Sequence, residues 1–131
     1  MSFHNRYMDW NNIRLELGIT SRFPRGSASR AFLLRLPLND DGSICVSAVD
    51  LNPGQATVRR FWASEPDQAG QVAREDQVWI FCCGRPREET ADFRLVSGDL
   101  RLGQSVTIEA PDGSMLPFRV TSVSPLAAPA P

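Results

Sequence analysis

Apolar and polar residues alternate along much of this chain, and a period of two is typical of β-strands with one face in a core. In Ile13–Leu17 the apolar residues occupy every second position, with Arg14 and Glu16 between them. The longer run Ala31–Leu38 places a phenylalanine and two leucines on one face, and its Pro37 indicates an edge strand or a bulge. We expect a strand in each segment, with its apolar face toward a core.

The last third of the chain predicts a β-hairpin. Ser105–Glu109 and Met115–Val123 both alternate, and Ala110–Gly113 between them contains the Pro-Asp-Gly sequence typical of a turn. The apolar residues expected to match across the hairpin are Val106 and Ile108 on the first strand and Phe118 and Val120 on the second.

The segment after Leu38 predicts a further hairpin. Asn39–Gly42 is expected to be a turn, because Asp and Gly tolerate the left-handed conformations of tight turns, and a short strand over Ile44–Val46 would return from it. Asn52–Gly54 then breaks the pattern, and Ala56–Trp62 resumes as a strand.

The third quarter of the chain is less regular. Gln68–Glu75 predicts one or two helical turns, although Gly70 lies in the middle of it. Gln77–Cys83 is apolar on both faces, as in a central strand that is covered on both sides. A charged loop over Gly84–Thr90 then leads to a short strand at Asp92–Leu95.

Short strands with turn signals about every ten residues predict a mainly β fold, namely one small antiparallel β-barrel or sandwich with at most one short helix. A chain of 131 residues has the size of one domain. We place this domain at residues 12–125, after a disordered leader (1–11) in which Met8 is a candidate for the true start. A disordered tail rich in Pro and Ala (126–131) follows it.

The charged side chains narrow the classes of function. The chain has 14 arginines and no lysine, yet 15 acidic residues leave a net charge of −1. The lack of lysine excludes Schiff-base and P-loop lysine chemistry, whereas arginine offers a planar set of donors to carboxylates and phosphates. Nucleic-acid and anionic-membrane surfaces normally carry a basic excess, so we expect neither as a partner. No apolar run is long enough to span a bilayer.

The cysteines and the histidine predict neither catalysis nor metal binding. The single histidine, His4, lies in the leader, so a Ser-His or Cys-His pair is not expected. Cys45, Cys82 and Cys83 lack the paired spacing of four-ligand zinc sites. Their odd number and the adjacency of two of them favour a reducing cytoplasm. We therefore predict no catalytic residue, no metal and no cofactor.

Two arginine-rich segments are candidates for binding an anion. The first is the loop Arg22–Arg30, whose glycine frees backbone amides and whose arginines and serines can donate to a phosphate or carboxylate. The candidate ligand-binding residues of this loop are Arg22, Arg25, Ser27 and Arg30. The alternative is an ordinary solvated hairpin loop, and the spacing is not that of a P-loop.

The second candidate segment is the strand-like Val58–Trp62, from which we select Arg59, Arg60 and Trp62. Alternation places Arg59 on one face with Phe61 and places Arg60 on the other with Trp62. Arg60 and Trp62 can then pair through a cation–π contact or stack a base between them. The alternative is one aromatic ring in the core and both arginines over the surface with their heads in water.

The sequence resembles a group of small, uncharacterised bacterial proteins of alphaproteobacterial type. The segments that carry the resemblance are Ile13–Leu17, Phe23–Ser27, Arg59–Trp62 and Phe118–Val120. The resemblance extends over Asn12–Pro125, with a divergent stretch between Asn39 and Thr57. It implies no activity, but it directs attention to the Phe-Pro-x-Gly-Ser loop and the Arg-Arg-Phe-Trp strand.

Three functions stay open on the sequence alone. The first is a non-catalytic binding module, whose Arg and aromatic surface takes an anionic small molecule or a protein partner, including a second copy of the chain. The second is a small enzyme that holds an anionic substrate with Arg22, Arg25 or Arg60 and uses a loop carboxylate as base. The third is single-stranded nucleic-acid binding on an OB-like barrel, which the near-neutral charge disfavours.

Overall fold

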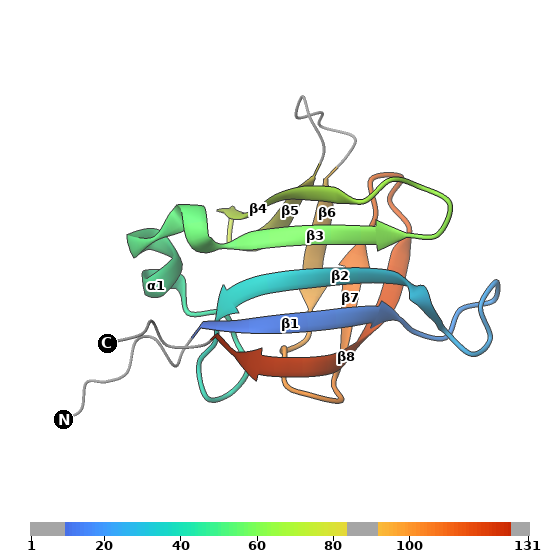
Figure 1. Ribbon diagram of the computed structural model, residues 1–131, viewed down its shortest axis with the longest axis horizontal. Helices are drawn as coiled ribbons and strands as arrows, with labels where there is room; N and C mark the ends of the chain where they lie inside the picture. Colours follow the sequence, from blue (N-terminus) through green and yellow to red (C-terminus); the bar gives the residue numbers. More distant parts are fainter. Residues whose placement is uncertain (1–9, 84–91, 127–131) are drawn as a thin grey trace.

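In residues 10–83 and 92–126, which the computed structural model describes, eight antiparallel strands close into a barrel (Figure 1). Each strand pairs with the next along the chain, and β1 pairs with β8. The strands are β1 (Trp10–Leu17), β2 (Ser27–Pro37), β3 (Thr57–Trp62), β4 (Gln68–Glu75), β5 (Val78–Cys83), β6 (Phe93–Ser97), β7 (Ser105–Glu109) and β8 (Met115–Pro125). The mainly β fold is confirmed, with a barrel rather than a sandwich.

Alternation determines which side chains fill the barrel. The apolar residues of Ile13–Leu17 are buried, as expected, and so are Phe32, Leu34 and Leu36 of β2. The predicted hairpin near the C-terminus is confirmed as β7 and β8, where Val106 pairs with Phe118. In the register of this hairpin, Ile108 pairs with Leu116 instead of Val120. Val120 pairs with Leu15 of β1, and this pairing of β8 with β1 closes the barrel.

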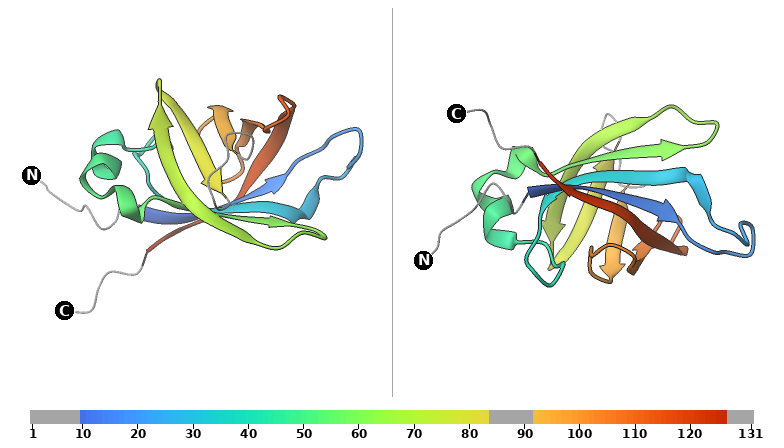
Figure 2. Two further views of the ribbon diagram at one scale, coloured as in Figure 1. Left: turned by 90° about the horizontal axis from the view of Figure 1, so that it is seen from above. Right: turned by 60° about the horizontal axis from the view of Figure 1, so that its bottom comes forward.

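One end of the barrel is closed by the connection between β2 and β3. This connection forms the short helix α1 (Val46–Leu51) and a 3₁₀ turn, η2 (Pro53–Gln55). Its buried residues Ile44 and Val49 join the core, together with Leu100 from the β6–β7 connection. Both views of Figure 2 show α1 at this end and the β1–β2 connection reaching beyond the opposite end.

The expected short strand over Ile44–Val46 is wrong. Leu38 and Ile44 form one isolated bridge, and α1 begins directly afterwards at Val46. The turn at Asn39–Gly42 does form, with the amide of Gly42 donating to the carbonyl of Asn39 at 2.9 Å. The chain leaves the sheet after the bridge because Ile44 and Val49 are needed to cover the end of the core.

The expected helical turns over Gln68–Glu75 are also wrong, because this segment is strand β4. It pairs with β3 on one side and with β5 on the other, and Val72 is buried in the core. These pairings outweigh the local preference of a polar segment. Asp76 and Gln77 have φ values of 51° and 67°, so a tight two-residue turn joins β4 to β5.

A cluster of phenylalanine rings occupies the middle of the barrel. The ring of Phe32, which is fully buried, has its centroid 5.2 Å from those of Phe81, Phe93 and Phe118. Eight strands enclose an interior just wide enough to be filled by side chains or to hold one small ligand. Here aromatic side chains fill the middle.

The boundaries of the domain differ slightly from those expected. Trp10 and Asn11 belong to β1, where they pair with Pro37 and Leu36, so they are part of the barrel rather than of a leader. The rest of the expected leader with Met8, the charged loop over Gly84–Thr90 and residues 127–131 lie outside the described residues. Among the residues that are described, no helix has the length and apolar character needed to cross a membrane.

Candidate binding site at the barrel mouth

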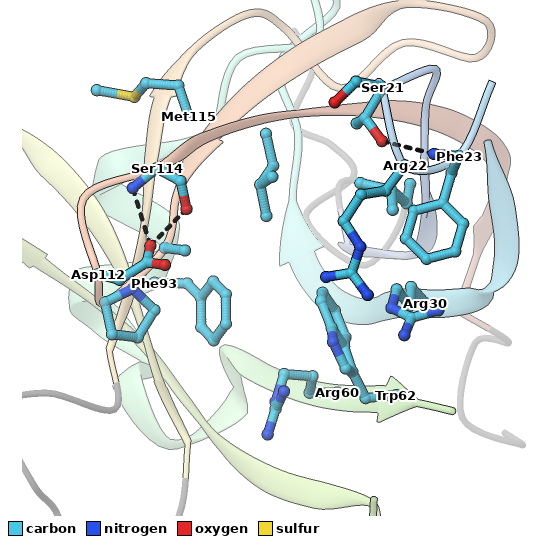
Figure 3. A pocket seen from close by; sticks show the side chains of 15 residues that line it. Ser21, Arg22, Phe23, Arg30, Arg60, Trp62, Phe93, Asp112, Ser114 and Met115 are labelled. Carbon is cyan, nitrogen blue, oxygen red and sulfur yellow. Dashed lines mark hydrogen bonds between the residues drawn. The ribbon is translucent and has the colours of Figure 1, made fainter. Parts of the chain in front are cut away.

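A pocket of about 660 Å³ opens at the end of the barrel opposite α1 (Figure 3). Since neighbouring strands run in opposite directions, odd-numbered strands end here and even-numbered strands begin here. Inward-facing residues from distant parts of the sequence therefore meet at one rim. Among them are Leu17 at the end of β1, Trp62 at the end of β3 and Phe93 at the start of β6.

The floor of the pocket is aromatic. The centroids of Trp62 and Phe93 lie 6.0 Å apart, and the two ring planes are tilted by 47°. Beneath them, the centroid of Phe32 lies 5.8 Å from that of Trp62, and the centroid of Phe118 lies 6.2 Å from it. Trp62, which is partly buried, and the edge of the largely buried Phe93 thus face the pocket and rest on a buried aromatic layer, which suits the apolar part of a ligand.

Arg60 is fixed against this floor from the β3 side. Its guanidinium carbon lies 5.1 Å from the ring centroid of Trp62 and 5.5 Å from that of Phe93, within the range of cation–π attraction. Its Nη2 donates to the side-chain oxygens of Glu65 at 3.2 Å and Gln68 at 3.1 Å. The Arg60 side chain is 12% exposed. Its Nε is buried and has no hydrogen-bond partner within the described residues, so an unused donor remains.

Arg22 and Arg30 lie at the rim beside Phe23, and Arg30 is the cross-strand partner of Trp62 in the β2–β3 pairing. The guanidinium carbon of Arg30 lies 4.4 Å from the centroid of Phe23, and that of Arg22 lies 5.6 Å from it. Neither arginine makes an ion pair with a carboxylate in the described part of the chain. Both guanidinium groups therefore contact the ring of Phe23, which carries no negative charge, so their positive charges remain uncompensated there.

The β1–β2 loop is folded so that Phe23 faces the pocket. The amide of Phe23 donates to Oγ1 of Thr20 at 3.0 Å, and the amide of Gly26 donates to the carbonyl of Phe23 at 2.9 Å. Gly26 has φ of +75°, and a Cβ on it would lie 2.6 Å from the carbonyl oxygen of Leu17. Only glycine fits this position without strain. The glycine singled out in the sequence therefore shapes the loop that carries Arg22.

Asp112 and Ser114 lie across the pocket, in the β7–β8 turn (Figure 3). The amide of Ser114 donates to Oδ1 of Asp112 at 2.9 Å, and the hydroxyl of Ser114 donates to the same oxygen. These hydrogen bonds from Ser114 lower the pKa of Asp112 below its ordinary value. The pocket thus has an ionised carboxylate on one side and arginines on the other.

The structure brings together four of the seven residues selected from the sequence. Arg22, Arg30, Arg60 and Trp62 line the pocket. The predicted alternation in β3 is confirmed, because Arg59 faces outward and lies 5.2 Å from the ring centroid of Phe61. Arg59 therefore does not belong to the site.

Arg25 and Ser27 lie in a second depression, of about 520 Å³, which is also lined by Arg119 and Thr121. In this part of β2 the hydroxyls of Ser27 and Ser29 are 3.0 Å apart. The loop Arg22–Arg30 therefore does not form one cradle, because its arginines are divided between two depressions.

Sequence reasoning missed Phe23, Phe93 and Asp112 as pocket residues. Asp112 was recognised only as part of a turn, and Phe93 only as part of a short strand. Phe23 carried a signal, since it adjoins Arg22 in the loop, but its aromatic contact with Arg30 depends on the fold of that loop. The contribution of Phe93 depends on strand order, which local patterning does not determine.

No cluster of three or more metal-ligating side chains occurs in the part of the chain that the structure describes. A scan of family models, a search of curated proteins and a search of solved structures each found no match to this chain. The functional assignment is accordingly based on the chemistry of the pocket.

Proposed function

We propose that this protein is a non-catalytic binding module that takes a small anionic molecule with an apolar part into the pocket at the barrel mouth. The observation that carries the proposal is the placement of Arg22 and Arg30, which have no carboxylate partner among the described residues, beside the aromatic floor of Trp62 and Phe93. Binding sites for small molecules commonly combine an apolar lining with a few convergent polar groups, in volumes of about 300–1,000 Å³.

The apolar and charged parts of the site have different roles in this proposal. Burial of a hydrocarbon or aromatic body against Trp62 and Phe93 provides most of the affinity, since it removes apolar surface from water. Arg22 and Arg30 provide the selectivity for an anion, because a neutral ligand would leave their charges uncompensated.

The chemistry of the opposite wall supports binding rather than catalysis. The Ser114 hydroxyl donates to Asp112, and the lowered pKa of Asp112 makes its carboxylate a weak base at neutral pH.

We further propose that the protein is located in the cytoplasm. The thiol of Cys45, which is not in a disulfide, supports this location, because a reducing compartment keeps thiols free.

Calorimetric titration with octanoate and with octanol tests this function, because the two share a hydrocarbon chain and differ in the charged head. We expect octanoate to bind at least about tenfold more tightly than octanol, a difference of about 1.4 kcal/mol. The double variant R22Q/R30Q should abolish this preference. The matched control R59Q changes an outward arginine of the same barrel and should preserve it.

Two results would contradict the proposed function. One is the absence of octanoate binding at millimolar concentration, and the other is equal affinity for the acid and the alcohol. Loss of the preference in R59Q to the same degree as in R22Q/R30Q would place the anion outside the pocket. Circular dichroism of each variant shows whether the barrel is folded.

A further inference from the structure

Among the described residues, closely packed rings lie directly behind the aromatic floor of the pocket. Phe32 and Phe118 are fully buried, and the centroid of Phe32 lies 5.2 Å from those of Phe81, Phe93 and Phe118. Ring centroids at this separation are in van der Waals contact. These rings separate the pocket from the rest of the barrel interior.

The far side of the aromatic cluster is filled as well. Ile44, Val49 and Leu100 are buried at the α1 end and belong to the same continuous core. A ligand that enters at the mouth therefore meets the packed side chains of this core, as far as the described residues form it. The depth available to its apolar part ends at Trp62 and Phe93.

We infer that the pocket selects compact apolar carboxylates by length, with the carboxylate between Arg22 and Arg30 and the apolar end against Trp62 and Phe93. This inference rests on the proposed function and makes it more specific. The ligand class is a medium-chain or single-aryl carboxylate. Long-chain fatty acids gain nothing from their additional length, because the carbons beyond the floor have no apolar wall to contact.

The energetic consequence is a limit in the dependence of affinity on chain length. A methylene that becomes buried contributes about 0.8 kcal/mol, which corresponds to about a fourfold increase in affinity. Methylenes that cannot pass the floor and turn back into water stay hydrated, so they add little to the affinity. Affinity should therefore rise steeply through the short acids and then level off.

Calorimetric titration with hexanoate, octanoate, decanoate, dodecanoate and myristate, each below its micellar concentration, tests this inference on the full chain. We expect a rise of about fourfold per methylene up to decanoate. From decanoate to myristate we expect a change of less than about twofold, since no further apolar surface is buried. A continued steep rise through myristate would overturn the length limit while leaving the proposed function intact. Failure of every acid to bind would overturn the proposed function itself.

A pair of matched variants tests the part played by the floor. F93L shortens a pocket-facing ring that lies against Phe32, so dodecanoate should gain at least about twofold over decanoate relative to the wild type. F61L makes the same change on the outer face of β3, where the ring contacts Arg59, and should leave the length profile unchanged. An unchanged profile in a folded F93L would contradict the inference. If F93L does not fold, the titration of the wild-type protein with the acids from hexanoate to myristate tests the length limit by itself.

Discussion

Two neighbouring arginines show how strongly position determines the role of a residue in this barrel. Arg59 and Arg60 are adjacent in β3 and have the same chemistry, yet Arg59 lies on the outer face and Arg60 lies against the rings of Trp62 and Phe93. Their difference follows from alternation alone, and it was predictable from the sequence. The contact of Arg60 with Glu65 and Gln68 was not, because it depends on the turn between β3 and β4.

The titration of Asp112 provides a prediction at the scale of a single residue. Hydrogen bonds from Ser114 lower its folded-state pKa below the ordinary value of 3.8, which approximates the unfolded state. The stabilisation from this turn is thus fully present well above pH 3.8 and is lost as the pH falls through the lowered pKa. A carboxyl ¹³C NMR titration should give a midpoint below 3.8 for Asp112, and S114A should move it upward. A midpoint at or above 3.8 in the wild type would show that the turn does not hold the carboxylate.

At the scale of elements, the β1–β2 loop depends on Gly26. The substitution G26A places a Cβ 2.6 Å from the carbonyl oxygen of Leu17 and imposes a positive φ on alanine. Strain of this kind costs about 1–3 kcal/mol, so the melting temperature should fall. The matched control G54A lies in η2, where an added Cβ has no heavy atom within 4 Å, and should be neutral or slightly stabilising. Equal melting temperatures for G26A and the wild type would contradict this account of the loop.

Elements with a strong local signal were predictable from the sequence, and elements set by distant contacts were not. β1 and the β7–β8 hairpin alternate cleanly, so their core faces could be assigned directly. β4 is polar and contains Gly70, and only its pairing with two neighbours makes it a strand. The helix α1 follows from the need to cover Ile44 and the end of the core, a requirement that exists only once the barrel is closed.

At the scale of the whole molecule, the two ends of the barrel differ. α1 lies at one end (Figure 1), where its apolar residues cover the core. The other end opens into the pocket, with arginines at its rim (Figure 3). The sequence suggested four residues of this pocket, but it also suggested Arg25, Ser27 and Arg59, which lie elsewhere. Grouping them correctly requires the order of the strands and the path of the β1–β2 loop, neither of which follows from local patterning.

Binding of a small apolar carboxylate at the mouth of the barrel can be observed residue by residue in an NMR titration of the ¹⁵N-labelled protein with octanoate. We expect progressive shifts of the Trp62 indole and of the Arg22, Arg30 and Arg60 Nε resonances, with Arg25 and Arg59 unchanged. Shifts confined to Arg25 and the outer face of β8, or no shifts at millimolar octanoate, would contradict it.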